Sequence, residues 1–196
     1  MTSGSQEYST KFTKLLEQLA SALDESSIQY MIIGGQAVLI YGEPRLTKDI
    51  DVTLALDADG LASLIPVVNK LHLAMLTEKP QDFVKKTSVL PVKDSQTGIR
   101  IDFVFSFTQY ERQAIEHARK IRLDEVDVAF ATPEDIIIHK IFSGRPRDIE
   151  DVRSIMRKNK RHDADYIRKW LKEFDDSLKS HSLETYEQIL LKEVAD

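Results

Sequence analysis

The sequence predicts an α+β protein in which short strands alternate with amphipathic helices and a helical extension ends the chain. Two apolar runs, Ile50 to Leu54 and Ile99 to Phe105, alternate in the manner of strands that are buried on one face. The segment from Tyr8 to Ser26 instead carries its apolar residues at helical spacing. The last segment, from Asp163 to Asp196, has helical spacing throughout and no strand pattern.

The composition is that of a globular protein without disulfide bonds. The chain has 196 residues, of which 42% are hydrophobic and 30% charged, with a net charge of −5. The absence of cysteine excludes a disulfide scaffold, thiolate metal ligands and cysteine catalysis. No apolar run reaches the ~18 residues of a membrane span, and the N-terminus lacks a secretory signal. We therefore expect a cytoplasmic protein with no membrane partner, built as a disordered tail (residues 1–6), a main domain (7–160) and a C-terminal helical extension (161–196).

The first half of the chain is organised around a strand, two glycines and a short helix. A helix over Tyr8–Ser26 precedes an apolar strand over Tyr30–Ile33. The strand stops at Gly34 and Gly35, and a short helix is expected from Gln36 to Tyr41. Two adjacent glycines let a backbone approach a ligand closely, because no Cβ stands in the way.

Two carboxylates share one face of the strand that follows. Since side chains alternate along a strand, Asp49 and Asp51 project away from the apolar face of Ile50. Two residues of strand span roughly 6.6 Å between Cα atoms. Carboxylates at that spacing repel each other unless cations lie between them, and paired divalent ions lie roughly 3.5–4 Å apart. The spacing therefore indicates a site for two divalent cations.

The middle of the chain is predicted to be less regular. Asp57 is expected to cap a helix that runs to Leu71. Residues 72–86 have no clear period, and Pro80–Asp82 has the composition of a turn. A strand is expected over Thr87–Val92, followed by a hairpin-like loop.

The strand over residues 99–105 carries one carboxylate, Asp102, on the face opposite its apolar residues. An unpaired carboxylate on so apolar a strand is costly, so Asp102 needs a partner. Arg100, two residues away on the same face, is one candidate. A helix is then expected from Tyr110 to Lys120, followed by two short strands, 121–123 and 126–130.

The next helix begins by the usual rules and carries a lysine of interest. Thr132 is expected to be the N-cap, Pro133 the first helical residue and Asp135 the acid of the first turn. Lys140 falls on or beside the apolar stripe of this helix, so it needs an anion. Lys140 either extends its ammonium to solvent, pairs with a nearby acid of the protein, or meets a nucleotide phosphate.

Asp148 is expected to be the N-cap of the following helix, with Asp151 three residues later. The tail then forms two helices, Tyr166–Asp176 and Leu183–Lys192. The region from Arg153 to Lys172 is the most basic part of the chain, which makes either a solvated helix face or a surface that steers a nucleic acid or nucleotide.

Gly34-Gly35, a short helix, Arg45, Thr47 and Asp49-Ile50-Asp51 resemble the signature of the DNA polymerase beta-like nucleotidyltransferase superfamily. Within it, the sequence is most similar to the small bacterial AbiEii-like and toxin-type nucleotidyltransferases, over residues 28 to 155. The run from Thr132 to Lys140 also resembles the toxin-type family. The chain departs from the superfamily at Gly35, where a serine that can contact phosphate is common.

The resemblance implies a polymerase beta-like fold, with a mixed sheet flanked by helices, and transfer of a nucleoside monophosphate from an NTP. It implies two Mg²⁺ ions, or Mn²⁺ in their place, held by the catalytic carboxylates Asp49, Asp51 and Asp102. The nucleotide-binding residues that it implies are Gly34, Gly35, Arg45, Thr47, Lys140 and Asp148.

The acceptor expected from the resemblance is a hydroxyl of RNA such as tRNA, of a protein or of a small molecule. A toxin of a toxin–antitoxin or phage-defence pair, with an antitoxin protein as partner, is one form of this function. The alternatives are a catalytically silent nucleotide-binding or protein–protein regulatory module of the same fold, and a Mg²⁺-dependent phosphohydrolase that uses the same acids.

Overall fold

A computed structural model describes residues 3–106 and 108–195 of the chain, which forms two compact units. Unit 1 comprises Met1–Ile33 and Thr47–Phe130, and unit 2 comprises Gly34–Leu46 and Ala131–Asp196. Residues 3–6 of the expected N-terminal tail belong to the first helix, and residues 1 and 2 lie outside the described residues. The expected boundary between residues 160 and 161 stays a prediction.

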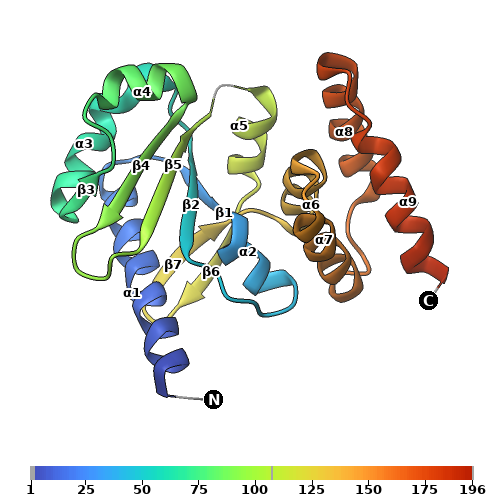
Figure 1. Ribbon diagram of the computed structural model, residues 1–196, viewed down its shortest axis with the longest axis horizontal. Helices are drawn as coiled ribbons and strands as arrows, with labels where there is room; N and C mark the ends of the chain where they lie inside the picture. The colour runs from blue at the N-terminus through green and yellow to red at the C-terminus, as the bar shows by residue number, and fades with distance from the viewer. Residues whose placement is uncertain (1–2, 107, 196) are drawn as a thin grey trace. The chain divides into compact units, whose positions relative to one another are not determined.

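Within the described residues, unit 1 contains a seven-stranded mixed sheet in the order β3-β4-β5-β2-β1-β7-β6 (Figure 1). The strands are β1 (Tyr30–Ile33), β2 (Asp49–Leu54), β3 (Leu73–Met75), β4 (Val89–Asp94), β5 (Arg100–Phe105), β6 (Arg119–Leu123) and β7 (Val126–Phe130). The pairs β2–β5 and β1–β7 are parallel, and the other neighbours are antiparallel. Strand β2 thus has a paired strand on each side.

The predicted alternation along the central strands is confirmed. Ile50, Val52 and Leu54 of β2 are fully buried, and so are the matching residues of β5, Ile101, Phe103 and Phe105. The helical segments of unit 1 are α1 (Ser3–Glu25), η1 (Ala58–Gly60), α3 (Leu61–Lys70), α4 (Pro80–Thr87) and α5 (Gln109–Glu116). The apolar stripe of α1 is buried against β7 and α3. This burial leaves the opposite face of β2 and β5 to carry the carboxylates.

Three sequence predictions in unit 1 were wrong in detail. Residues 72–86 are not a loose stretch, because they contain β3 and most of α4, and Pro80 begins that helix. The helix expected to reach Lys120 ends at Glu116, and β6 begins at Arg119. Asp57 caps the short helix η1, and the longer α3 follows it as a separate helix.

Unit 2 consists of helices in the described residues. They are α2 (Gly34–Tyr41), α6 (Pro133–Ser143), α7 (Pro146–Lys158), α8 (Ala164–Leu178) and α9 (Ser182–Ala195). Helix α6 packs against α7, α8 and α9, and α2 packs against α6 and α7. As predicted, the Thr132 hydroxyl accepts a hydrogen bond from the Asp135 amide, with Pro133 at the first helical position. Gly144 ends α6 in the left-handed region, at φ +64°.

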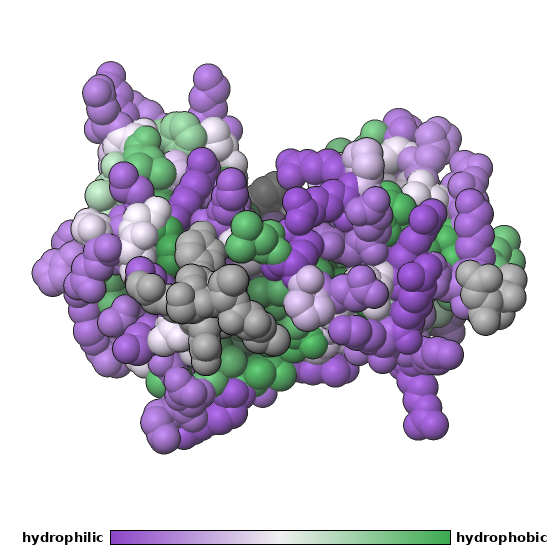
Figure 2. All heavy atoms as spheres, turned by 60° about the horizontal axis from the view of Figure 1, so that its bottom comes forward, coloured by the Kyte–Doolittle hydropathy of each residue, from purple (hydrophilic) through white to green (hydrophobic). Residues whose placement is uncertain are grey.

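Among the described residues, no helix is long and apolar enough to cross a membrane. Hydrophilic residues predominate on the face of the molecule shown in Figure 2, as the 30% content of charged residues leads one to expect.

Candidate active site

The three predicted carboxylates lie on two neighbouring strands of unit 1. Asp49 and Asp51 come from β2 and Asp102 from β5, and all three are half-buried. The parallel register pairs Asp51 directly with Asp102. Paired residues of neighbouring strands point to the same face of a sheet, and such strands lie roughly 4.8 Å apart. The fold therefore brings together carboxylates that are 51 positions apart in sequence, the interval between residues 51 and 102.

Asp102 is also paired with Arg100. The Arg100 Nε donates to both oxygens of Asp102, at 2.9 and 3.1 Å, and Nη2 lies 2.9 Å from Oδ1. The Arg100 side chain is 54% exposed and that of Asp102 is 19% exposed. An ion pair with so exposed a partner contributes roughly 0–1 kcal/mol, so a stronger ligand can replace it.

Thr47 precedes β2 and holds its first carboxylate. The Thr47 hydroxyl lies 3.3 Å from Oδ1 of Asp49 and 3.3 Å from the Asp49 carbonyl oxygen. Thr47 itself is buried. The Thr47 hydroxyl therefore holds the backbone at the start of β2 and orients the Asp49 side chain.

The donor atoms fit a hard divalent cation in kind, because Mg²⁺ and Mn²⁺ prefer carboxylate oxygens. In the structure as described, however, no group of three or more histidine, cysteine, aspartate or glutamate side chains is arranged to hold a metal ion. In this structure both oxygens of Asp102 are engaged by Arg100. For Asp102 to join Asp49 and Asp51 around a cation, its side chain must leave Arg100.

The two glycines form the start of α2 in unit 2. The helix begins at Gly34, two residues earlier than the sequence indicated, and Gly34 has φ +65°. Glycine adopts this left-handed conformation without the cost of a Cβ. The first amides of a helix have no partner within it, and they can bind an anion such as phosphate.

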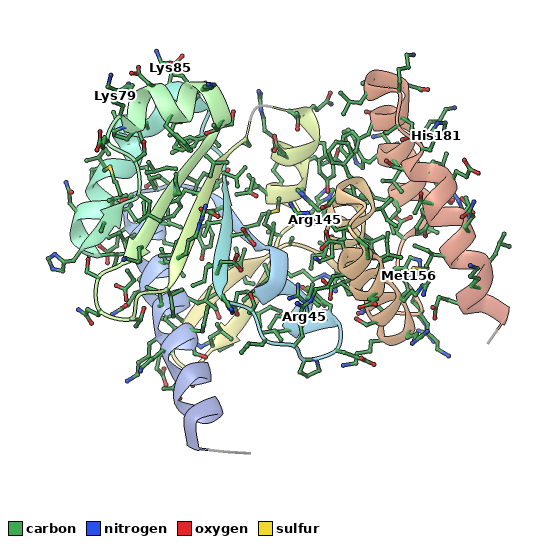
Figure 3. The ribbon with its side chains drawn as sticks, in the orientation of Figure 1. Arg45, Lys79, Lys85, Arg145, Met156 and His181 are labelled. Atoms are coloured by element: carbon green, nitrogen blue, oxygen red, sulfur yellow. The ribbon has the colours of Figure 1, made fainter. Side chains whose placement is uncertain are left out.

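A network of two cations and two carboxylates joins three of the predicted residues of unit 2. Arg45 donates to both oxygens of Asp151, at 2.9 and 3.0 Å. Lys140 contacts Asp148 at 2.6 Å and Asp151 at 2.8 Å. In Figure 3 the labelled Arg45 lies beside α7, the helix that carries both acids. The ion pair that the sequence left open for Lys140 is thus present.

The Lys140 ammonium is held deep in unit 2. Its side chain is 9% exposed, and the side chains of Asp148 and Asp151 are 13% and 6% exposed. Burial raises the pKa of Asp148, but hydrogen bonds from Lys140 and Ser143 and the charges of Lys140 and Arg145 outweigh it, so this pKa lies below its ordinary value. Asp148 therefore stays ionised at neutral pH.

Asp148 is not the N-cap that the sequence predicted. Arg145 occupies that position without a side-chain cap, and Pro146 is the first helical residue. Asp148 therefore lies in the first turn of α7, where its carboxylate meets Lys140. The sequence reasoning also missed Asp151, which it treated as a capping residue. The available signal was the spacing of Asp148 and Asp151, since residues three apart share one face of a helix.

The predicted residues are therefore distributed over both units. Unit 1 carries Thr47 and the three carboxylates, and unit 2 carries the glycine turn and the charge network. Within unit 1 the fold places Asp51 opposite Asp102, and within unit 2 it joins Arg45, Lys140 and Asp148.

Solved structures similar to this one include that of the antibiotic-resistance factor ANT(2'')-Ia in solution. It has a TM-score of 0.61 and 17% sequence identity, over 91% of this chain and 98% of that one. The crystal structure of ANT(2'')-Ia in complex with adenylyl-2''-tobramycin gives a TM-score of 0.58 and 16% identity, over 85% and 98% of the two chains. An antigenic nucleotidyltransferase-like protein from Paracoccidioides brasiliensis gives 0.55 and 19%, over 88% and 92%.

At these identities the likenesses concern the fold alone, and they confirm the predicted class, an α+β nucleotidyltransferase fold with a mixed sheet and C-terminal helices. No curated protein matched the sequence. A model of the family described as "Nucleotidyltransferase of unknown function (DUF6036)" matches residues 10–192.

Proposed function

The chain belongs to the family of nucleotidyltransferases of unknown function described as DUF6036, and from this we propose that it transfers a nucleoside monophosphate from an NTP to a hydroxyl acceptor and releases pyrophosphate. The observation that carries the proposal is the parallel register of β2 and β5, which pairs Asp51 with Asp102. Asp51 and Asp102 lie on the same face of two neighbouring strands of the sheet, and Asp49 is two residues from Asp51. Carboxylates in this arrangement can hold cations, which suits a reaction in which phosphate charge must be neutralised.

The carboxylates have distinct roles in this proposal. Asp49 and Asp51 would hold the cations that accompany the triphosphate, and Asp102 would complete the shell nearest the acceptor hydroxyl. Two Mg²⁺ ions, or Mn²⁺, would neutralise the phosphate oxygens and acidify that hydroxyl. Thr47 orients Asp49 through its hydroxyl contact. Arg100 would release Asp102, at the small cost expected for an exposed ion pair.

Residues of unit 2 are the proposed phosphate ligands. The amides of Gly34 and Gly35 would bind phosphate oxygens at the start of α2. Arg45 and Lys140 would neutralise phosphate charge, and Asp148, which pairs with Lys140, would lie at the rim of the nucleotide site. These roles come from the resemblance of the sequence; in the structure, carboxylates of α7 already contact both Arg45 and Lys140.

The acceptor class is part of the proposal. A solved structure of similar fold contains adenylyl-2''-tobramycin, which makes the hydroxyl of a small molecule one class to test. RNA, such as tRNA, and protein hydroxyls are the others. A toxin role with an antitoxin partner belongs to the same proposal, and growth arrest on expression that Asp51→Ala relieves would support it.

The experiment is an incubation with each α-labelled NTP and Mg²⁺ against tRNA, a protein lysate and aminoglycosides. We expect label on one acceptor class. Asp51→Ala and Asp102→Asn should each reduce transfer by roughly 10²- to 10³-fold. Asp127→Asn is the matched control, because it removes a carboxylate from an exposed position of β7 in the same unit and should leave transfer unchanged. Transfer that survives Asp51→Ala or Asp102→Asn contradicts the proposed site.

The second candidate function is a catalytically silent nucleotide-binding module, which the contact of Arg100 with both oxygens of Asp102 favours. The variant Arg100→Gln separates the two candidates. An enzyme should keep or increase its transfer when Asp102 is released. A silent module should bind NTP in the presence of Mg²⁺ but transfer no label in either form.

A further inference from the structure

Both cations of the network in unit 2 are already engaged by carboxylates. Arg45 is held by Asp151, and Lys140 is shared between Asp148 and Asp151. Two positive and two negative charges sum to zero, so the network as it stands has no net charge with which to attract a phosphate. For either cation to neutralise a phosphate, a carboxylate has to give way.

The two carboxylates differ in how firmly they are held. Both oxygens of Asp151 are engaged, and Oδ2 receives Arg45 Nη2 at 3.0 Å and Lys140 Nζ at 2.8 Å. This oxygen therefore fixes the two cations side by side. Asp148 contacts one cation, Lys140, through Oδ1 at 2.6 Å and also accepts a hydrogen bond from Ser143. Its side chain is more exposed, at 13% against 6% for Asp151, which contacts two cations.

The surroundings of Asp151 tie the segment before β2 to α7. The hydroxyl of Ser154 donates to the Asp151 carbonyl oxygen at 2.9 Å and accepts from the Glu43 amide at 3.2 Å. The Lys158 ammonium donates to the Gly42 carbonyl oxygen at 2.6 Å. The backbone that leads to Arg45 is thus held along one side of α7, and Asp151 orients the end of its side chain.

We propose that Asp151 is a positioning residue that keeps Arg45 and Lys140 together, and that Asp148 is an exchangeable partner whose place on Lys140 is taken by a phosphate of the bound nucleotide. The inference rests on the proposed function and names the partner exchange by which the phosphate is admitted. When Asp148 leaves, the remaining three groups carry one net positive charge. The phosphate then meets two cations in fixed positions.

The two acids are distinguished by the sign of the effect on phosphate binding. Asp148→Asn removes the negative charge that competes with the phosphate for Lys140, so inorganic triphosphate with Mg²⁺ should bind about tenfold more tightly, as expected when the hydrogen bond to be broken no longer involves a carboxylate. Asp151→Asn adds the same net charge but releases both cations from their fixed positions. It should weaken binding by about tenfold or more.

The measurement is isothermal titration calorimetry of the full chain with inorganic triphosphate and Mg²⁺ at constant ionic strength. Asp165→Asn is the matched control, because it removes one negative charge from an exposed position of α8 in the same unit, and it should change the affinity less than about twofold. Thermal unfolding checks that each variant is folded. If Asp151→Asn does not fold, Asp151→Glu retains the charge and moves the carboxylate by one methylene, and it too should weaken binding.

The possible results separate this inference from the proposed function. Equal tightening by both asparagine variants would mean that net charge alone matters and would overturn the positioning role of Asp151. Weaker binding by Asp148→Asn would overturn the exchange. If the wild-type protein transfers label but binds no triphosphate, the inference is wrong and the proposed function stands. If it neither binds triphosphate nor transfers label, both are wrong.

Discussion

Replacing Lys140 with methionine should destabilise the protein, because it leaves one buried carboxylate, Asp151, and one half-buried carboxylate, Asp148, with a single cation. Breaking a buried ion pair by removing one partner costs roughly 3–5 kcal/mol. Arg45 still neutralises Asp151 through two hydrogen bonds, so we expect the lower end of that range, about 3 kcal/mol. For a chain of this size that loss lowers Tm by roughly 6–12 °C, since each kcal/mol corresponds to roughly 2–4 °C.

The assay is urea unfolding at 25 °C, followed by circular dichroism at several pH values. The double variant Lys140→Met/Asp148→Leu should recover most of the loss, because the unpaired carboxylate has gone with the lysine. Lys172→Met, at an exposed position of α8, is the control and should lie within about 0.5 kcal/mol of the wild-type protein.

The pH dependence follows from the lowered pKa of Asp148 in the folded protein. The ionised form of Asp148 is favoured in the folded state, so its contribution to stability is complete above its ordinary pKa and is lost as the pH falls through the lowered one. The difference between wild-type protein and Lys140→Met should therefore shrink as the pH falls through the lowered pKa. A Lys140→Met variant as stable as the wild-type protein at pH 7 would refute the reasoning, as would a difference that grows in acid.

Three further variants test interactions within unit 1 or within unit 2. Asp175→Ala should cost about 1 kcal/mol, because the Asp175 carboxylate accepts hydrogen bonds from the amides of Ser182 and Leu183 at the start of α9. Burial raises the pKa of Asp175, but these bonds and those from neighbouring hydroxyls lower it overall. The cost, measured by urea unfolding, should therefore vanish as the pH falls through that lowered pKa. Gly144→Ala should cost about 1–2 kcal/mol, because φ +64° at the end of α6 is unfavourable for alanine, and a Tm equal to that of the wild-type protein would contradict this. Leu19→Ala, at a fully buried position of α1, should cost about 2–5 kcal/mol in the same urea titration, and a loss below about 1 kcal/mol would show that α1 is not part of the core.

Much of the fold could be predicted from local patterns. The central strands alternate cleanly between apolar and polar residues, and a threonine, a proline and an acid mark the start of α6 at Thr132. The region between α3 and β4 could not be predicted in this way. Strand β3 has three residues and lies at the edge of the sheet, so it offers too few positions for a period to be detected.

The candidate site was predictable only where its residues are close together in the sequence. The pair of acids on β2 is local, and the alternation of Asp102 with apolar neighbours marked it as exceptional. Its register against Asp51 is a property of the folded sheet. The contact of Arg45 with Asp151 joins residues 106 positions apart, so no local sequence pattern could predict it. Pro146 did carry a usable signal, because proline favours the first helical position and so excludes Asp148 from the cap.

The short pairing between β1 and β7 affects which strands of the sheet open first in local unfolding. Strand β1 pairs with β2 along four positions, whereas its pairing with β7 is assigned at one, Ile32 with Phe130. The hairpin of β6 and β7 should therefore separate from the sheet at a lower free energy than β2 and β5, while its contacts with α1 continue to hold it. In a hydrogen-exchange experiment its amides should take up deuterium before those of β2 and β5. Strands β2 and β5, which carry the candidate acids, should then exchange more slowly than β6 and β7 and keep the acids in place while that hairpin fluctuates.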